Sequence, residues 1–163
     1  MPRTEARSRL SVSWWTLGVW GAAALYAVLL SLESLADHYG FRTGVDAAIY
    51  DQEVWLLANF HEPFTTVLNR HMLGEHFQPG LALLVPLYWL GFGIPAVLVA
   101  HTIAIALTAP ALYALARSAG ASPGISSIPA FLWLASPAVA AANLADWRAV
   151  TFASALVVLS VLA

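Results

Sequence analysis

The sequence contains no cysteine and no lysine. Without cysteine it has neither a disulfide framework nor a thiolate metal site. Charged residues make up 10% of the 163 residues, whereas a soluble domain usually carries about 25%. No basic cluster exists, and the net charge of −2 gives no reason to expect nucleic acid as a partner. Hydrophobic residues, at 60%, predict an all-α integral membrane protein.

The few charges are unevenly placed along the chain. Arg3, Arg7 and Arg9 precede the first apolar run, and most of the acids fall between Glu33 and Glu75. Because cytoplasmic loops of membrane proteins carry the excess of arginine, the N-terminus is predicted to be cytoplasmic and the acidic region to lie outside. We therefore expect a multi-pass protein of the cell membrane.

Long apolar runs predict a polytopic helical bundle of about four spans. A bilayer core needs roughly 20 apolar residues. A cleaved signal peptide is the alternative for the first run, but signal cores are typically only about 7–15 residues long, so an uncleaved anchor is favoured. The fourth run is too short to cross, so a missing C-terminal part of the same protein is expected. The predicted single membrane domain has a cytoplasmic N-terminus at 1–11, spans at 12–32, 95–117, 125–144 and 149–163 (incomplete), a cytoplasmic turn at 118–124 and an outer turn at 145–148.

The outer loop, residues 33–94, is predicted to hold two helices that lie along the membrane. Residues 46–60 read as an amphipathic interfacial helix, with Tyr50, Val54 and Leu57 on its apolar stripe. Residues 79–92 are too short to span and contain Pro86, as in an interfacial or re-entrant helix. If this segment crossed instead, Arg117 would lie outside; the positive-inside bias favours the non-crossing alternative.

Asp46 is the first candidate catalytic residue, because it opens the interfacial helix. A carboxylate partly desolvated there could take a proton from an attacking hydroxyl, although an N-cap or first-turn acid is an equally ordinary role. Asp51 and Glu53 are expected to form the wet face of the helix.

A second cluster lies in "NRHMLGEHFQP", residues 69–79. His71, Glu75 and His76 could bind a divalent cation, but their spacing fits no strong metal motif. Arg70 and His76 could instead contact an anionic headgroup or phosphate of a membrane lipid. A third alternative is that residues 69–79 form a polar turn without a ligand. Because these alternatives stay open, no metal ligand is assigned.

Asp146 and Arg148 end the third predicted span. In the preferred threading they face the same compartment as Asp46, which makes them candidates for substrate binding, together with Asp51, Arg70, Glu75 and His76. An interfacial ion pair anchored by Trp147 is the alternative. His101 lies alone inside a span, where a hydrogen bond to a neighbouring helix is the simplest role.

The order of four motifs is similar to that of a known family. The stretches "VDAAIYDQEVWLLAN", "GEHFQPGLALLVPLYWL", "ALYALARSAG" and "SPAVAAANLADWR" resemble a bacterial membrane-protein family catalogued as domain of unknown function 2079, over about residues 41–150. Two positions depart from the family pattern. Glu75 stands where the family has aspartate, and "DWRA" at 146–149 replaces Asp-Phe-His-Pro and so lacks its histidine.

That family in turn looks like a distant relative of the GT-C glycosyltransferases, which take a sugar from a polyprenyl-phosphate carrier. The resemblance implies that Asp46 activates the acceptor, that Arg70 and His76 lie near the carrier phosphate, and that Asp146 shapes the same pocket. It implies a polyprenyl-phosphate sugar donor as partner and establishes no cofactor, with a divalent cation left open. The alternative is a non-catalytic membrane protein that binds a lipid or partner, or a transporter component.

Overall fold

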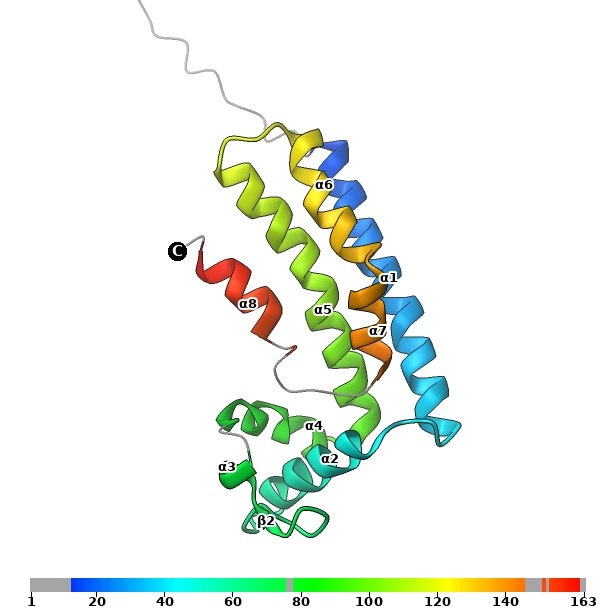
Figure 1. Ribbon diagram of the computed structural model, residues 1–163, viewed down its shortest axis with the longest axis vertical. Coiled ribbons are helices and arrows are strands. Elements are labelled where there is room, and N and C mark those ends of the chain that lie inside the picture. Colours follow the sequence, from blue (N-terminus) through cyan, green and yellow to red (C-terminus); the bar gives the residue numbers. More distant parts are fainter. Residues whose placement is uncertain (1–12, 76–77, 146–150, 152, 162–163) are drawn as a thin grey trace, which may run out of the picture.

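The computed structural model describes residues 13–75, 78–145, 151 and 153–161, and this part of the chain is almost entirely helical (Figure 1). Helices α1 (Trp14–Tyr39), α5 (Gly93–Ser118), α6 (Pro123–Leu134) and α7 (Pro137–Ala145) form an elongated bundle, and α8 (Ala153–Ser160) packs on α5. The remaining elements gather at one end of the bundle. They are α2 (Val45–Ala58), β1 (Phe64–Thr65), β2 (Arg70–His71), α3 (Met72–Glu75), η1 (Pro79–Leu84) and α4 (Val85–Trp89).

Helix α1 is longer than its apolar run. It begins after Ser13, whose hydroxyl accepts a hydrogen bond from the Trp15 N–H, and continues past Leu32 to Tyr39. The helix therefore extends seven residues beyond the predicted span at 12–32, and Glu33 and Asp37 are helical. No proline or glycine interrupts the chain between Leu32 and Gly40, so nothing stops the helix at the end of the apolar run.

Two helices among the described residues are long and apolar enough to cross a membrane, namely α1 and α5. Helices α6 and α7 form a third such segment if they are counted as one span, but they are bent by 43° where Pro137 follows the break. Helix α8 has only eight residues. The described part of the chain is thus an all-α membrane-type bundle with two spans, or three if α6 and α7 count as one, and the fourth predicted span was expected to be incomplete.

The bundle is held by buried apolar side chains and by a few hydrogen bonds between helices. Val19 of α1, Ala109 and Tyr113 of α5 and Ala130 of α6 form one buried cluster. The Trp133 indole N–H donates to the Ile105 carbonyl at 2.9 Å, which ties α6 to α5. Helix α8 joins α5 through the Thr108 and Ser154 hydroxyls, 2.9 Å apart. These hydrogen bonds satisfy polar groups for which no water is available inside a bilayer.

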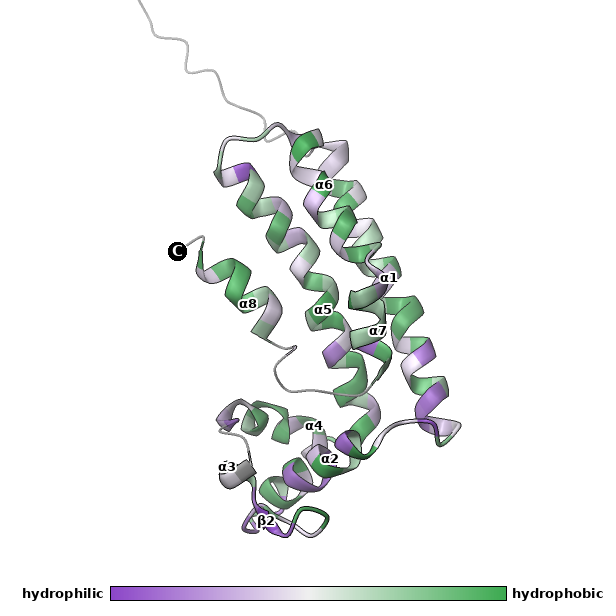
Figure 2. Cartoon of the chain, in the orientation of Figure 1, coloured by the Kyte–Doolittle hydropathy of each residue, from purple (hydrophilic) through white to green (hydrophobic). Residues whose placement is uncertain are grey.

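The short elements cap the end of the bundle where α1 finishes and α5 begins. Ala47, Val54 and Ala58 of α2 pack against side chains of η1, α4 and α5, including Leu81 and Val97. Figure 2 shows strongly hydrophilic residues gathered in α2, around β2 and at the end of α1, while the bundle helices are mostly hydrophobic. The polar part of the chain is therefore concentrated at one end of an apolar bundle.

The segment predicted to lie at the interface forms two consecutive short helices, η1 and α4. Together they span Pro79–Trp89, which is shorter than a membrane-crossing helix. Gly91 then adopts a φ of 80°, a conformation that residues with a side chain rarely adopt, and the Phe92 N–H donates back to the Leu87 carbonyl at 3.1 Å. This tight turn leads directly into α5.

Candidate functional site

Helix α2 carries three acids across the capped end of the bundle. It begins after Gly44, an extended residue with ψ of 177°, so that Asp46 lies in the first helical turn. Asp46 is half-buried. A carboxylate in the first turn is stabilised by the partial positive charge of the helix N-terminus. The expected position of Asp46 at the start of a helix over this segment is therefore what the structure has.

Glu53 contradicts the expected wet face of this helix. Its side chain is only 2% exposed, which makes it one of the largest fully buried side chains of the described residues. The alternation of acids with apolar residues suggested a solvated face, but burial of a helix side depends on its neighbours, and α2 is covered by β1, η1, α4 and the start of α5. A buried carboxylate is tolerated where polar groups of the fold interact with it, and Glu53 has such an interaction, so its position is fixed and it is a candidate functional group.

Asp46 and Glu53 lie on the same face of α2. They are seven residues apart, which is nearly two helical turns, so their Cα atoms are about 10 Å apart along the axis. Ile49, between them at helical spacing, is also buried. This seven-residue spacing was a signal in the sequence that could have paired the two acids before the structure was known.

Asp51 points elsewhere, toward α4. Its carboxylate accepts a hydrogen bond of 2.6 Å from the hydroxyl of Tyr88, 37 residues further along the chain. Burial raises the pKa of Tyr88 above its usual range, and the hydrogen bond and charge of Asp51 raise it further. Asp51, predicted to bind substrate, is thus engaged in joining α2 to α4.

The segment with Arg70 folds against the middle of α2. Gln52 bonds to Thr66 in both directions, donating from its amide nitrogen at 3.1 Å and accepting from the Thr66 N–H at 3.1 Å. The strands β1 and β2 pair antiparallel beside this contact, with Thr65 opposite Arg70. Arg70 is exposed in β2. It therefore belongs to the same end of the molecule as the acids of α2.

The predicted metal ligands are only partly described. His71 accepts a hydrogen bond at Nδ1 from the Leu73 N–H, at 3.1 Å, and Glu75 ends α3. His76 lies outside the described residues. Among the residues that the structure describes, no group of three or more histidines and acids is placed to hold a metal ion.

Asp146 and Arg148 also lie outside the described residues. Helix α7 ends just before them and α8 begins just after them, both toward the end of the bundle that carries α2 (Figure 1). Asn143, one turn of α7 earlier, is 4% exposed, and neither amide atom has a hydrogen-bond partner within the described part of the chain. Sequence reasoning missed this residue, because an asparagine among alanines gives no sign of what surrounds it.

His101 is buried within α5, with 1% of its surface exposed, one turn before the buried Ile105. Neighbouring hydroxyls of this helix bond within the helix itself. Thr102 donates to the Leu98 carbonyl at 3.2 Å, and nearly two turns further Thr108, which also contacts Ser154 of α8, donates to the Ala104 carbonyl at 3.4 Å. Such back-bonding is a common way to accommodate threonine in a buried helix.

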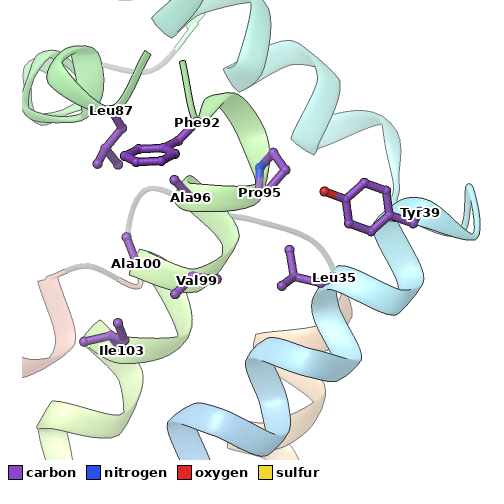
Figure 3. A pocket seen from close by; sticks show the side chains of 9 residues that line it. All are labelled: Leu35, Tyr39, Leu87, Phe92, Pro95, Ala96, Val99, Ala100 and Ile103. Carbon is purple, nitrogen blue, oxygen red and sulfur yellow. The ribbon is translucent and has the colours of Figure 1, made fainter. Parts of the chain in front are cut away.

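One pocket lies at the same end of the bundle, and it is apolar (Figure 3). It has a volume of about 500 Å³ and lies between the end of α1, α4 and the first part of α5. The site thus combines acids on α2 with a neighbouring hydrocarbon-lined space.

Comparison with known proteins found one family. The family described as "Predicted membrane protein (DUF2079)" matches residues 37–163. No curated protein and no solved structure matched the chain.

Proposed function

We propose a function from the premise that this chain belongs to the DUF2079 family of predicted membrane proteins. The proposed function is that of a GT-C-like membrane glycosyltransferase, to which this chain contributes the acid-bearing outer end. The donor would be a sugar on a polyprenyl phosphate, and the acceptor a hydroxyl group presented at the membrane surface.

One observation carries the proposal. Asp46 and Glu53 share a face of α2, a helix that caps one end of an apolar bundle, and Glu53 is buried there. A lipid-linked sugar would reach this level from the bilayer, and a water-borne acceptor would reach it from outside. The orientation that goes with this proposal has the N-terminus in the cytoplasm and α2 on the outer side.

The proposed reaction is a single displacement at the anomeric carbon. The acceptor oxygen forms a bond to that carbon while the bond from the carbon to the phosphate oxygen breaks. The acceptor proton passes to the Asp46 carboxylate, and the polyprenyl phosphate leaves with the electron pair. General base assistance of this kind contributes typically about 10²–10⁴-fold to the rate. Asp146 is proposed to shape the same pocket as Asp46, and Arg70 and His76 are proposed to lie near the leaving phosphate, where a guanidinium pairs well with phosphate oxygens.

The test uses the protein in vesicles with a panel of radiolabelled sugars on polyprenyl monophosphate. Asp46→Asn should lower sugar transfer by about 100-fold or more, since an amide cannot accept the proton. Glu53→Gln, which keeps the shape of the side chain, should also lower transfer. Glu62→Gln is the matched control, because Glu62 is exposed outside α2, and it should leave transfer unchanged. Transfer by Asp46→Asn at the rate of the unaltered protein would remove Asp46 from the mechanism.

A non-catalytic or transporting role is the second candidate, and the buried polar residues of α5 favour it. His101 and Thr102 lie inside a helix long enough to span the membrane, and ionisable groups there often mark transport pathways. Loss of substrate uptake in His101→Gln, with no sugar transfer by the unaltered protein, would support this role over the transferase.

A further inference from the structure

Phe41 and Phe60 hold a backbone conformation that phenylalanine rarely adopts. Phe41 has a φ of 56° and Phe60 has a φ of 58°. In this left-handed region the Cβ of an L-residue lies too close to the following carbonyl oxygen, so a bulky residue there is a genuine outlier. Such positions persist where the surrounding structure requires them, and they cluster at functional sites.

Both residues occupy the same position of the same helix-ending turn. Phe41 is the second residue after α1, and Phe60 is the second residue after α2. In each turn two backbone N–H groups donate to carbonyls of the last helical turn, namely Phe41 to His38 at 3.1 Å and Arg42 to Asp37 at 2.8 Å, and Phe60 to Leu57 at 3.1 Å and His61 to Leu56 at 2.9 Å. This pair of hydrogen bonds defines the Schellman motif, whose left-handed position is usually glycine.

Two other helices of the chain end in the same motif, and there the left-handed residue is glycine. Gly91 follows α4 with a φ of 80°, and Gly120 follows α5 with a φ of 85°. Both turns have the same two backbone hydrogen bonds. The turn itself therefore does not require a phenylalanine. The two turns that have one are those on either side of α2, since Phe41 precedes this helix and Phe60 follows it.

Neither ring is buried in the protein. Phe41 is 96% exposed and Phe60 is 87% exposed. The Phe60 ring stacks on Trp89 with 6.1 Å between the ring centroids, and the Trp89 indole N–H donates to the Ala58 carbonyl at 2.8 Å, so the ring is held in place at the surface. An apolar ring in water and a left-handed phenylalanine are both unfavourable. Both features are explained together if the rings face lipid instead of water.

The ends of α1 lie about as far apart as the two interfaces of a bilayer. From Trp14 to Tyr39 the helix rises about 38 Å at 1.5 Å per residue, and a bilayer is about 30 Å thick in its hydrocarbon core and about 40–45 Å with its interfacial regions. Trp14 is exposed at one end of α1, and Phe41 follows the other end. Phe60 belongs to this second end, because Trp89, on which it stacks, lies just before the start of α5 (Figure 1). Aromatic side chains are enriched at both interfaces of a membrane.

We propose that Phe41 and Phe60 are membrane anchors, whose rings enter the interfacial layer of the leaflet in which α1 ends and α5 begins. The 14 residues of α2 extend over about 20 Å between them, so two points of contact hold this helix along the membrane plane. A bilayer suits two separate rings, because it has no fixed shape to match, whereas a protein partner needs a continuous complementary surface of about 800 Å². The inference does not depend on the transferase proposal, since anchoring is measured without any sugar transfer.

The test measures the depth of α2 in vesicles of phosphatidylcholine that contain the full chain. The chain has no cysteine, so a single cysteine at Val45, an exposed residue at the start of α2, can carry a fluorophore. Phosphatidylcholine brominated high on its acyl chains quenches a label at the interface, and aqueous iodide quenches a label in water. The double variant Phe41→Gly/Phe60→Gly should lower quenching by the brominated lipid at least threefold and raise quenching by iodide.

Thermal unfolding in detergent separates anchoring from a structural role of the rings. Glycine suits the left-handed turn, so the double glycine variant should unfold at the same temperature as the unaltered protein or at a higher one. Phe41→Trp/Phe60→Trp keeps an aromatic ring at each position and should keep the quenching by brominated lipid. Val67→Gly is the matched control, because Val67 is an exposed apolar residue between β1 and β2, and it should change neither kind of quenching.

Three results would overturn the proposal. The first is lipid quenching in the double glycine variant that equals that of the unaltered protein. The second is unfolding of this variant at a lower temperature in detergent, which would make the rings part of the packing. The third is shielding of the label from both quenchers in the unaltered protein, which would assign the surface to a contact with another protein chain.

Discussion

Removing the hydroxyl of Tyr88 should loosen α4 from α2. The Tyr88 hydroxyl donates to the Asp51 carboxylate at 2.6 Å, and a hydrogen bond to a charged group contributes about 1.5–3 kcal/mol. Both side chains are half-buried, so water can replace part of the interaction, and the lower half of that range applies. Tyr88→Phe should therefore cost about 1.5–2 kcal/mol, which is an approximately 10–30-fold increase in the population of the opened α4.

Hydrogen exchange at the end of α4 measures this opening directly. The N–H groups of Leu90, Gly91 and Phe92 donate back to carbonyls of α4, so their exchange reports when the helix separates or frays. Exchange at these amides should accelerate in Tyr88→Phe by the factor above. Asp51→Asn keeps an acceptor but loses the charge, and it should cost about 1 kcal/mol.

The double variant and a matched control complete the test. If the two side chains stabilise α4 through each other, the double variant should cost less than the sum of the single variants. Tyr39→Phe removes the hydroxyl of a residue that is 68% exposed, and it should leave exchange at α4 unchanged. Exchange in Tyr88→Phe within twofold of the unaltered protein would refute the assignment of this hydrogen bond as the link between α2 and α4.

Three further predictions concern ionisation, the backbone and orientation. Because the pKa of Tyr88 is raised above its ordinary value of about 10, its contribution to stability is complete below pH 10 and is lost only as the pH rises through the folded-state pKa. The tyrosinate absorbance of Tyr88→Phe should therefore match that of the unaltered protein up to about pH 10 and fall below it only at higher pH; a difference already at pH 10 contradicts this. Gly91→Ala should destabilise the protein by about 1–2 kcal/mol in thermal unfolding, since the φ of Gly91 is 80°. Gly21→Ala in α1 is the control: a Cβ has open space there, so this change should be neutral or stabilising by up to about 1 kcal/mol. Equal effects of the two substitutions would show that backbone strain is not the cause. A cysteine in place of Arg117 should react with a membrane-impermeant reagent only from the cytoplasmic side and one in place of Asp46 only from the outside, and labelling of both from one side would refute the orientation proposed for the transferase.

Several features of the fold could be predicted from local pattern. The predicted apolar stripe of α2 is confirmed, since Val54 and Ala58 are buried in the core cluster and Tyr50 and Leu57 pack against it. The short segment before α5 is also too short to span, as its length and Pro86 indicated. These predictions succeeded because they depend on residues within one or two turns of each other.

Other features could not be predicted, because they depend on contacts between distant segments. Tyr88 lies 37 residues after Asp51, and no periodicity relates the two. Pro137 in the sequence indicated a disturbance of the third predicted span, but a proline alone does not determine whether a helix is kinked or broken at that point. The roles of Asp146, Arg148 and His76 stay predictions.

Composition, the length of the apolar runs and the position of the acids determined by themselves that this is a helical membrane protein with a polar end. Those properties follow because apolar side chains are unfavourable in water and charged side chains are unfavourable in lipid. They can be predicted without knowing which segments of the chain contact each other. The tertiary structure alone decided that Glu53 is buried while Asp51 bonds to α4, and that α1, α4 and α5 leave a groove between them. Burial and concavity are properties of surfaces that face each other, and which surfaces meet is fixed only when the whole chain has packed.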